Sequence, residues 1–199
     1  MIVMHIGPHK TATTYIQHNF RVARPALEAR GWTYPELGTE GLPGHHDMAH
    51  DAWRYVGPDA EKGPDLVDLG RTARAQGRNL VFSAEGFCRW SPPKLDGFSN
   101  ALEAEQLDLV YVVRDPLDIF YSYWAEEVKQ GHSCSLPERI AENFNDPFSS
   151  RLLNPLIDLS GFMRQENTRL HVVPYEALRS LDIDIFEHIC EAVLGLPDI

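Results

Sequence analysis

The sequence predicts an α/β fold of three layers, in which a short parallel sheet lies between two layers of helices. Short apolar runs rich in β-branched residues alternate along the chain with longer segments whose apolar residues recur at helical spacing. The runs predict four parallel strands, near residues 1–6, 79–83, 107–113 and 169–173, and the first two read as buried. Right-handed crossovers would bring the carboxyl ends of these strands to one edge of the sheet.

The composition limits the classes of protein to which this chain can belong. The chain has 199 residues, of which 43% are hydrophobic and 24% charged, which fits a single domain over residues 1–199. A formal net charge of −11 argues against a nucleic-acid partner and against an anionic membrane surface. The three scattered cysteines indicate free thiols in a reducing compartment. We see neither a signal peptide nor a membrane span, so we expect a cytoplasmic protein.

The first predicted strand runs into a loop suited to an anion. Gly7 and Pro8 end the strand, Lys10 and four small residues follow, and a helix is expected over residues 13–30 with Gly31 as its stop. The first N–H groups of a helix have no internal partner, and the helix dipole adds partial positive charge there. Small side chains let a phosphate approach the backbone, and the lysine supplies a full charge.

This loop is not a Walker A motif, because no glycine stands directly before Lys10. The segment 9–14, with Ile16 and Gln17 after it, resembles the phosphosulfate loop P-K-T-G-T-T of sulfotransferases that use 3′-phosphoadenosine-5′-phosphosulfate (PAPS). His9 stands in place of the proline and Ala12 in place of the glycine. If position 12 needs a positive φ, Ala12 strains the loop by about 1 kcal/mol. The alternative is an ordinary loop whose threonines only cap a helix.

The region between the first two long strands is polar and rich in turns. Residues 32–34 read as a short strand, residues 35–46 as a loop and residues 64–77 as a helix. His46 and His50 would share one face of a helix, at a spacing that suits two metal ligands. The glutamate of an H-E-x-x-H motif is missing and no third ligand is evident, so we expect no metal and favour a polar helix start or the lining of an acceptor pocket.

Glu85 lies just past the second long strand, beside a glycine. In open α/β sheets, ligands bind outside the carboxyl ends of the strands, so a carboxylate there is well placed for chemistry. The family resemblance implies a catalytic base at this place, histidine in some members and glutamate in others. We therefore expect Glu85 to be the base, with His9 and His46 as alternatives. A capping or surface glutamate is the other reading.

A second motif follows the third predicted strand. Asp115 is expected to cap a helix that begins at Pro116, and Ser122 lies two turns further on the same face. Arg114 and Ser122 could then converge on one anion, for which the arginine fork is well suited. Arg114, Pro116, Ser122 and Tyr123 resemble the sequence that binds the 3′-phosphate of PAPS in the same family. A structural Arg–Asp pair with a solvated serine is the alternative.

The remaining segments predict further helices and one late aromatic residue. Tyr175 follows the fourth strand, and the resemblance places such a tyrosine near the adenine, although a core tyrosine is an equal reading. Family members often continue with a loop that covers the nucleotide, and this sequence shows none, so either a short member or a truncated chain is expected. Helices are expected near residues 99–106, 136–144, 148–165 and 183–194.

These patterns together predict a P-loop-like sulfotransferase with PAPS as co-substrate and an acceptor that is a small molecule, a glycan or a lipid. The expected catalytic residues are Lys10 and Glu85. Two other functions stay open: a P-loop kinase for a small metabolite, which would need ATP and Mg²⁺, and a non-catalytic module that binds PAPS or its desulfated product. The expected cofactor-binding residues are Lys10, Thr11, Ala12, Thr13, Thr14, Arg114, Ser122 and Tyr175.

Overall fold

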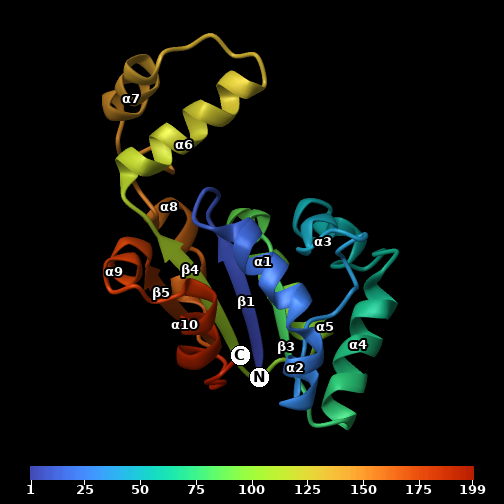
Figure 1. Ribbon diagram of the computed structural model, residues 1–199. Helices are drawn as coiled ribbons and strands as arrows, with labels where there is room; N and C mark the ends of the chain where they lie inside the picture. Colours follow the sequence, from blue (N-terminus) through green and yellow to red (C-terminus); the bar gives the residue numbers. More distant parts are fainter.

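The computed structural model describes residues 1–199 and contains an all-parallel sheet of five strands between two layers of helices (Figure 1). The strand order is β2-β3-β1-β4-β5, so the first long strand lies in the centre of the sheet. The predicted three-layer α/β/α class is therefore confirmed. A fifth, two-residue strand lies on the edge. The strands are β1 (Ile2–Gly7), β2 (Trp32–Thr33), β3 (Asn79–Ser83), β4 (Leu107–Val113) and β5 (Thr168–Pro174).

Successive side chains of the strands point to opposite faces, which builds two separate cores. In β1, Met4 and Ile6 belong to one core and Val3 to the other; in β4, Leu109 and Val110 divide in the same way. Both faces of the sheet are therefore covered, as expected for β1, β3 and β4, which are buried along nearly their whole length. The edge strand β5 differs, because only one of its residues, Val173, is buried.

Each core is closed by its own set of helices (Figure 1). One face is covered by α1 (Thr13–Val22), α2 (Arg24–Ala29), α9 (Tyr175–Ser180) and α10 (Ile185–Ala192). The other face is covered by α3 (His46–His50), α4 (Gly63–Ala75), α5 (Pro92–Ala101), α8 (Leu156–Leu159) and the short 3₁₀ turns η1 (Ala52–Arg54), η2 (Glu85–Arg89) and η3 (Phe162–Arg164). No helix combines the length and the apolar character that crossing a bilayer requires.

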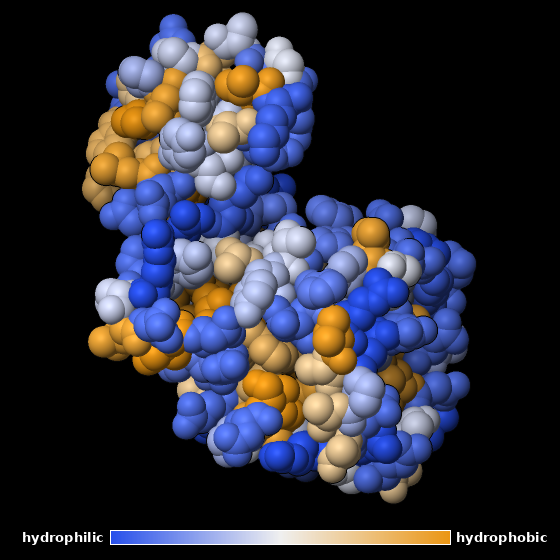
Figure 2. Space-filling view, viewed as in Figure 1, coloured by the Kyte–Doolittle hydropathy of each residue, from blue (hydrophilic) through white to orange (hydrophobic).

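Two further helices, α6 (Pro116–Lys129) and α7 (Leu136–Asn145), form an arm above the carboxyl ends of the strands (Figure 1). Figure 2 shows this arm as an upper lobe joined to the body by a narrow, mostly hydrophilic waist. The predicted cap of α6 is confirmed, because Asp115 accepts a hydrogen bond from the Leu117 N–H at 2.8 Å. The arm lies directly over the edge of the sheet where the sequence places its candidate residues.

Two helical predictions need correction. The helix expected over residues 13–30 is divided at Ala23, because Pro25 lacks the N–H that a continuous helix would use. The helix expected at 99–106 instead begins at Pro92. Proline is favourable in the first turn of a helix, so the two prolines after Ser91 start α5 rather than prevent it.

The long helix expected over residues 148–165 is absent. Only α8 and η3 are helical there. Pro155 disfavours a helical conformation of Asn154, and the Asn154 side chain donates to the Phe148 carbonyl at 2.8 Å, which closes a turn instead. Of the leucines expected to face the core, only Leu159 is buried, and Leu156 is exposed, so the spacing misjudged burial as well as helix length.

Two buried histidines tie the elements together at the carboxyl ends of β1 and β3. His5 Nδ1 lies 2.7 Å from Ser83 Oγ across these neighbouring strands. His45 Nδ1 accepts from the Ser83 N–H at 3.1 Å, and its Nε2 lies 3.1 Å from the Pro35 carbonyl oxygen. Burial lowers the pKa of His5 to about 4, against a raising effect of Glu85, and burial lowers the pKa of His45 to about 3. Both rings are therefore neutral at pH 7 and act as hydrogen-bonding cross-links.

We predict that the protein loses stability as the pH falls below the ordinary histidine pKa of 6.5. The unfolded chain binds protons there, whereas folded His5 and His45 do not, so each destabilises the fold by about 2 kcal/mol between about pH 7.5 and about pH 5. Urea unfolding over this range measures the effect. His18→Gln, which removes an exposed histidine, is the control for the substitution itself. A free energy of unfolding that is flat with pH would contradict the prediction.

Candidate functional site

The sheet topology brings the candidate residues to one place. From β1 the chain builds β2 and β3 on one side, then crosses to β4 and β5 on the other. The crevice outside the carboxyl end of β1 is thus the point at which the strand order reverses, where α/β sheets bind ligands. The loops after β1, β3 and β4 carry the predicted residues and meet there.

The loop after β1 leaves the start of α1 uncapped. Ala12 occupies the position before the helix with φ of 62°, and no side chain caps the helix. Thr11 instead donates to the Pro8 carbonyl oxygen at 2.6 Å. The condition set by the sequence is therefore met, because position 12 is left-handed and alanine there costs about 1 kcal/mol. Lys10 is also left-handed, with φ of 66°.

Thr13 and Thr14, the last residues of the predicted loop, begin α1. Thr13 is buried and Thr14 is exposed. Neither hydroxyl caps the helix, so the alternative in which the threonines serve only as caps does not match the geometry. The N–H groups of the first turn are left without a side-chain partner, which is the condition an anion needs.

Gly7 sets the distance between the end of β1 and Glu85. Its φ is +96°, and a Cβ placed there would lie 2.8 Å from the Cα of Glu85. Only glycine permits so close an approach at this backbone angle. The loop that carries His9 and Lys10 is therefore held directly against the segment that carries Glu85.

The Glu85 carboxylate lies among three polar side chains from other elements. Gln17 donates to its Oε2 at 2.7 Å, His9 Nδ1 lies 3.5 Å from its Oε1, and His46 Nδ1 lies 4.0 Å from its Oε2. His46 Nε2 is also 3.1 Å from Gln17 Oε1, which links the two. The Glu85 side chain is only 15% exposed. Base candidates from three separate segments thus form one cluster.

Burial and hydrogen bonding oppose each other at this cluster. Burial pushes the pKa of Glu85 upward, but hydrogen bonds from its own backbone and from Gln17, with His46 and His9 nearby, outweigh it and lower that pKa. Burial lowers the pKa of His9, against the attraction of Glu85 and with added repulsion from Arg89, His50 and Lys10. At neutral pH the cluster therefore contains an ionised Glu85 and an uncharged His9.

Arg114 joins the second motif to the first loop. It donates to the Lys10 carbonyl oxygen at 2.7 Å, and its guanidinium lies over the Tyr175 ring, 5.0 Å from the centroid. Its Nε is 3.7 Å from Glu176 Oε1. The Lys10 ammonium is 3.7 Å from Glu126 Oε2 of α6 and 28% exposed. The structure therefore brings Lys10, Arg114 and Tyr175 together, and shows a carboxylate partner for each cation.

Ser122 and Tyr123 lie on α6 above this site. Ser122 is half-buried and makes no hydrogen bond with Arg114, so the structure does not bring this predicted pair into contact. The Tyr123 ring is edge-on to His9, with centroids 6.4 Å apart, and burial raises the pKa of Tyr123 to about 12. The second motif therefore contributes to two places: Arg114 beside Tyr175, and Tyr123 beside the base cluster.

Two cavities adjoin these residues, one on each face of the sheet. A groove of about 390 Å³ between α1 and α9 is lined by Ala12, Tyr15 and Tyr175. A smaller cavity of about 170 Å³ is lined by His9, Arg114 and mostly apolar residues. The first has the size and aromatic lining that suit a nucleobase, and the second has room for a small apolar body.

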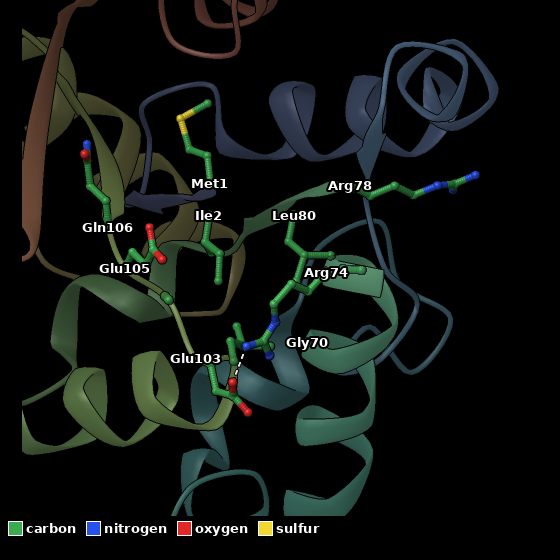
Figure 3. Close-up of a pocket in the computed structure, with 12 residues that line it drawn as sticks. Met1, Ile2, Gly70, Arg74, Arg78, Leu80, Glu103, Glu105 and Gln106 are labelled. Carbon is green, nitrogen blue, oxygen red and sulfur yellow. Dashed lines mark hydrogen bonds and ion pairs between the residues drawn. The ribbon is translucent and has the colours of Figure 1, made fainter. Parts of the chain in front are cut away.

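A third cavity, of about 460 Å³, lies at the opposite edge of the sheet (Figure 3). Met1, Ile2, Leu80 and Gln106 line it, at the amino ends of β1, β3 and β4. It contains none of the predicted site residues. Because ligands of parallel sheets bind at the carboxyl ends, its size does not make it the better candidate.

Gln17, Arg89 and Glu126 belong to the site but were not predicted for it. Gln17 follows Thr13 by four residues, so helical spacing alone could have shown that both face the loop. Glu126 is 116 residues from Lys10, and no local pattern indicates that pairing. Arg89, in turn η2, has a lowering effect on the pKa of both His9 and Tyr123. No three His, Cys, Asp or Glu side chains in the structure are arranged to hold a metal ion.

The chain was compared with protein-family models, with curated proteins and with solved structures. None of the three comparisons finds a match. The function proposed below therefore depends on the residues and geometry of this chain.

We predict that Gly7→Ala disrupts the site more than its backbone angle alone requires. Gly31 provides a matched control, because its φ is +79° and a Cβ there meets nothing within 4 Å. Gly31→Ala should cost about 1 kcal/mol of unfolding free energy, whereas Gly7→Ala should cost about 2 kcal/mol more because Glu85 must move. Urea unfolding of both variants measures the difference. Equal losses of unfolding free energy in the two variants would show that the close approach of Gly7 to Glu85 does not affect stability.

Proposed function

We propose that the protein is a sulfotransferase that moves the sulfuryl group of PAPS to a hydroxyl or amine of an acceptor. The observation that carries the proposal is the hydrogen bond from Arg114 to the Lys10 carbonyl oxygen, 2.7 Å long between residues 104 apart in sequence. It unites two segments that, from sequence alone, were each predicted to bind one phosphate of the same nucleotide. ATP has no 3′-phosphate and would leave the second segment without a ligand.

The nucleotide is proposed to bind across the start of α1. The 5′-phosphosulfate would lie against the uncapped N–H groups of α1 and the Lys10 ammonium. The adenine would occupy the groove beside Tyr175. The Tyr175 ring also lies under the Arg114 guanidinium. Arg114 would then reach the 3′-phosphate, in exchange for its contact with Glu176 at 3.7 Å.

The same arrangement accounts for the chemistry of transfer. The loop N–H groups and Lys10 stabilise the negative charge that develops on the departing phosphate. The cluster of Glu85, His9 and His46 supplies a proton acceptor for the attacking hydroxyl or amine. No metal takes part in this scheme. We propose a cytoplasmic location for the enzyme, on the basis of its cysteine usage.

The small cavity beside His9 guides the choice of acceptors. Its volume of about 170 Å³ and its largely apolar lining favour phenols and short alcohols over long glycans. A panel of such compounds, assayed for release of the desulfated nucleotide adenosine 3′,5′-bisphosphate (PAP), is therefore the first test of turnover.

We predict that PAP binds more tightly than ATP or 5′-ADP, and that Lys10→Ala and Arg114→Ala each weaken PAP binding about 10- to 100-fold. The reason is the loss of charge-assisted hydrogen bonds to phosphate, each worth about 1.5–3 kcal/mol. Isothermal titration calorimetry measures the affinities. Arg71→Ala is the matched control, because Arg71 is an exposed partner of Asp68 on the same helix and lies outside the site. Equal affinity for PAP and 5′-ADP would contradict the 3′-phosphate site.

We also predict that Glu126→Gln strengthens PAP binding. In the absence of ligand the Lys10 ammonium lies 3.7 Å from Glu126, and this ion pair must open when a phosphate binds. A partly exposed ion pair contributes about 0.2–1 kcal/mol, so its removal should raise affinity up to about 5-fold. Glu142→Gln, which removes an exposed partner of Arg139 on the same arm, is the control. Weaker binding by Glu126→Gln would show that Glu126 assists the ligand instead of competing with it.

A further inference from the structure

The cluster at Glu85 contains two groups that could accept a proton, and its geometry distinguishes them. Glu85 Oε2 accepts from Gln17 at 2.7 Å, and Oε1 faces His9 Nδ1 at 3.5 Å. Both oxygens of this 15% exposed side chain are therefore directed at protein groups. A base must be reached by the acceptor, and the Glu85 carboxylate is enclosed by Gln17, His9 and His46.

His9 is arranged in the opposite way. Its Nδ1 is directed at Glu85, and its side chain is 30% exposed. Nε2 makes no hydrogen bond to protein and is not fully buried. His9 also lines the small cavity at the end of β4, next to Lys10 in the chain. An acceptor hydroxyl placed there would meet an imidazole before it met a carboxylate.

We infer that His9 is the proton acceptor of the site and that Glu85 is a positioning residue that orients the His9 ring. This inference rests on the proposed function and assigns the base within it. It differs from the expectation that the carboxylate after β3 takes the proton. Gln17 and His46 extend the arrangement, since both contact Glu85 and each other, and so fix the carboxylate that faces His9.

The protonation states agree with this assignment. The lowered pKa of Glu85 makes it a weak base, whereas neutral His9 has a basicity closer to the working pH. The groups that face His9 from the surrounding elements are Glu85 and Arg89 of η2, His50 of α3, and Tyr123 of α6, besides neighbouring Lys10. With Glu85 ionised, the ring proton is held on Nδ1 and the lone pair lies on Nε2.

The step can be written with its atoms and electrons in balance. The acceptor oxygen forms a bond to sulfur while its proton passes to His9 Nε2. The bond between sulfur and the bridging phosphate oxygen breaks, and its electron pair leaves with PAP, next to Lys10. The imidazolium that forms lies beside the Glu85 carboxylate, which stabilises its charge. Proton loss to solvent through the exposed edge of His9 restores the base.

The first test does not need an acceptor. Histidine ring resonances are titrated by NMR in the wild type and in Glu85→Gln, with His9→Gln to assign the signal. Glu85→Gln should lower the pKa of His9 by about one unit, because the carboxylate that favours the imidazolium is lost. The ring signal of the exposed His18 serves as the internal reference. An unchanged His9 titration would overturn the pairing.

The second test separates the two candidate bases. PAP release from PAPS is followed against pH, with water alone and with the phenol and alcohol panel. His9→Gln should lower turnover about 10²- to 10⁴-fold and abolish the rise of rate through the His9 pKa measured by NMR. Glu85→Gln should keep that rise, shifted to lower pH. The reverse pattern, with His9→Gln active and Glu85→Gln inactive, would overturn the inference.

PAP binding by the same variants tests the proposed sulfotransferase function separately from the assignment of His9 as the base. Both variants should bind PAP within about 3-fold of the wild type, since neither residue is assigned to a phosphate. Loss of PAP binding by the wild type itself would remove the proposed function. Wild-type PAP binding without turnover of any acceptor, water included, would leave a binding module and overturn the assignment of His9 as a base.

Discussion

The close contact between the end of β1 and the Glu85 backbone is the constraint on which the site depends. Gly7 permits that contact, with a left-handed backbone and no side chain in the way. The central position of β1 then places its loop between the segments after β3 and β4. Without this approach, His9 and Glu85 would belong to separate loops, and the loop of Lys10 would not lie within reach of Arg114. One small residue thereby brings the loop of Lys10 against the cluster around Glu85.

Buried polar groups hold the neighbourhood of this contact rigid. His5 and His45 both bond to Ser83, two residues before Glu85, from different segments. Because each ring is neutral and fully enclosed, the cross-links contribute hydrogen bonds without a buried charge. The strand end that carries Glu85 is therefore fixed from β1 and from the loop before α3. Preorganisation of this kind is what a proton-transfer site requires, since a base displaced by about 1 Å loses much of its effect.

Much of the fold could be predicted from sequence because its strands are local, continuous apolar runs. The bounds of β3 and β4 agree with the predicted residues, and the condition attached to Ala12 is met by its φ of 62°. The errors have a common origin. The helix expected over 148–165 was inferred from leucine spacing alone, although a proline and an asparagine side chain interrupt it. Hydrophobic period indicates which face is buried, but local hydrogen bonds decide where a helix ends.

The site could be predicted only in part, for a related reason. Each motif identifies cations that suit a phosphate, but not the carboxylates that accompany them in the absence of ligand. Lys10 pairs with Glu126 and Arg114 pairs with Glu176, and both of these carboxylates are distant in sequence. Arg114 also pairs with Asp118, four residues further along the chain. These pairs are partly exposed, so their mutual attraction is small and a doubly charged phosphate can displace them. In a chain with a net charge of −11, the two cations of the proposed anion site are thus each balanced by a carboxylate. Under the proposed function, a ligand with two separated phosphates would engage both cations, whereas a single phosphate would engage only one.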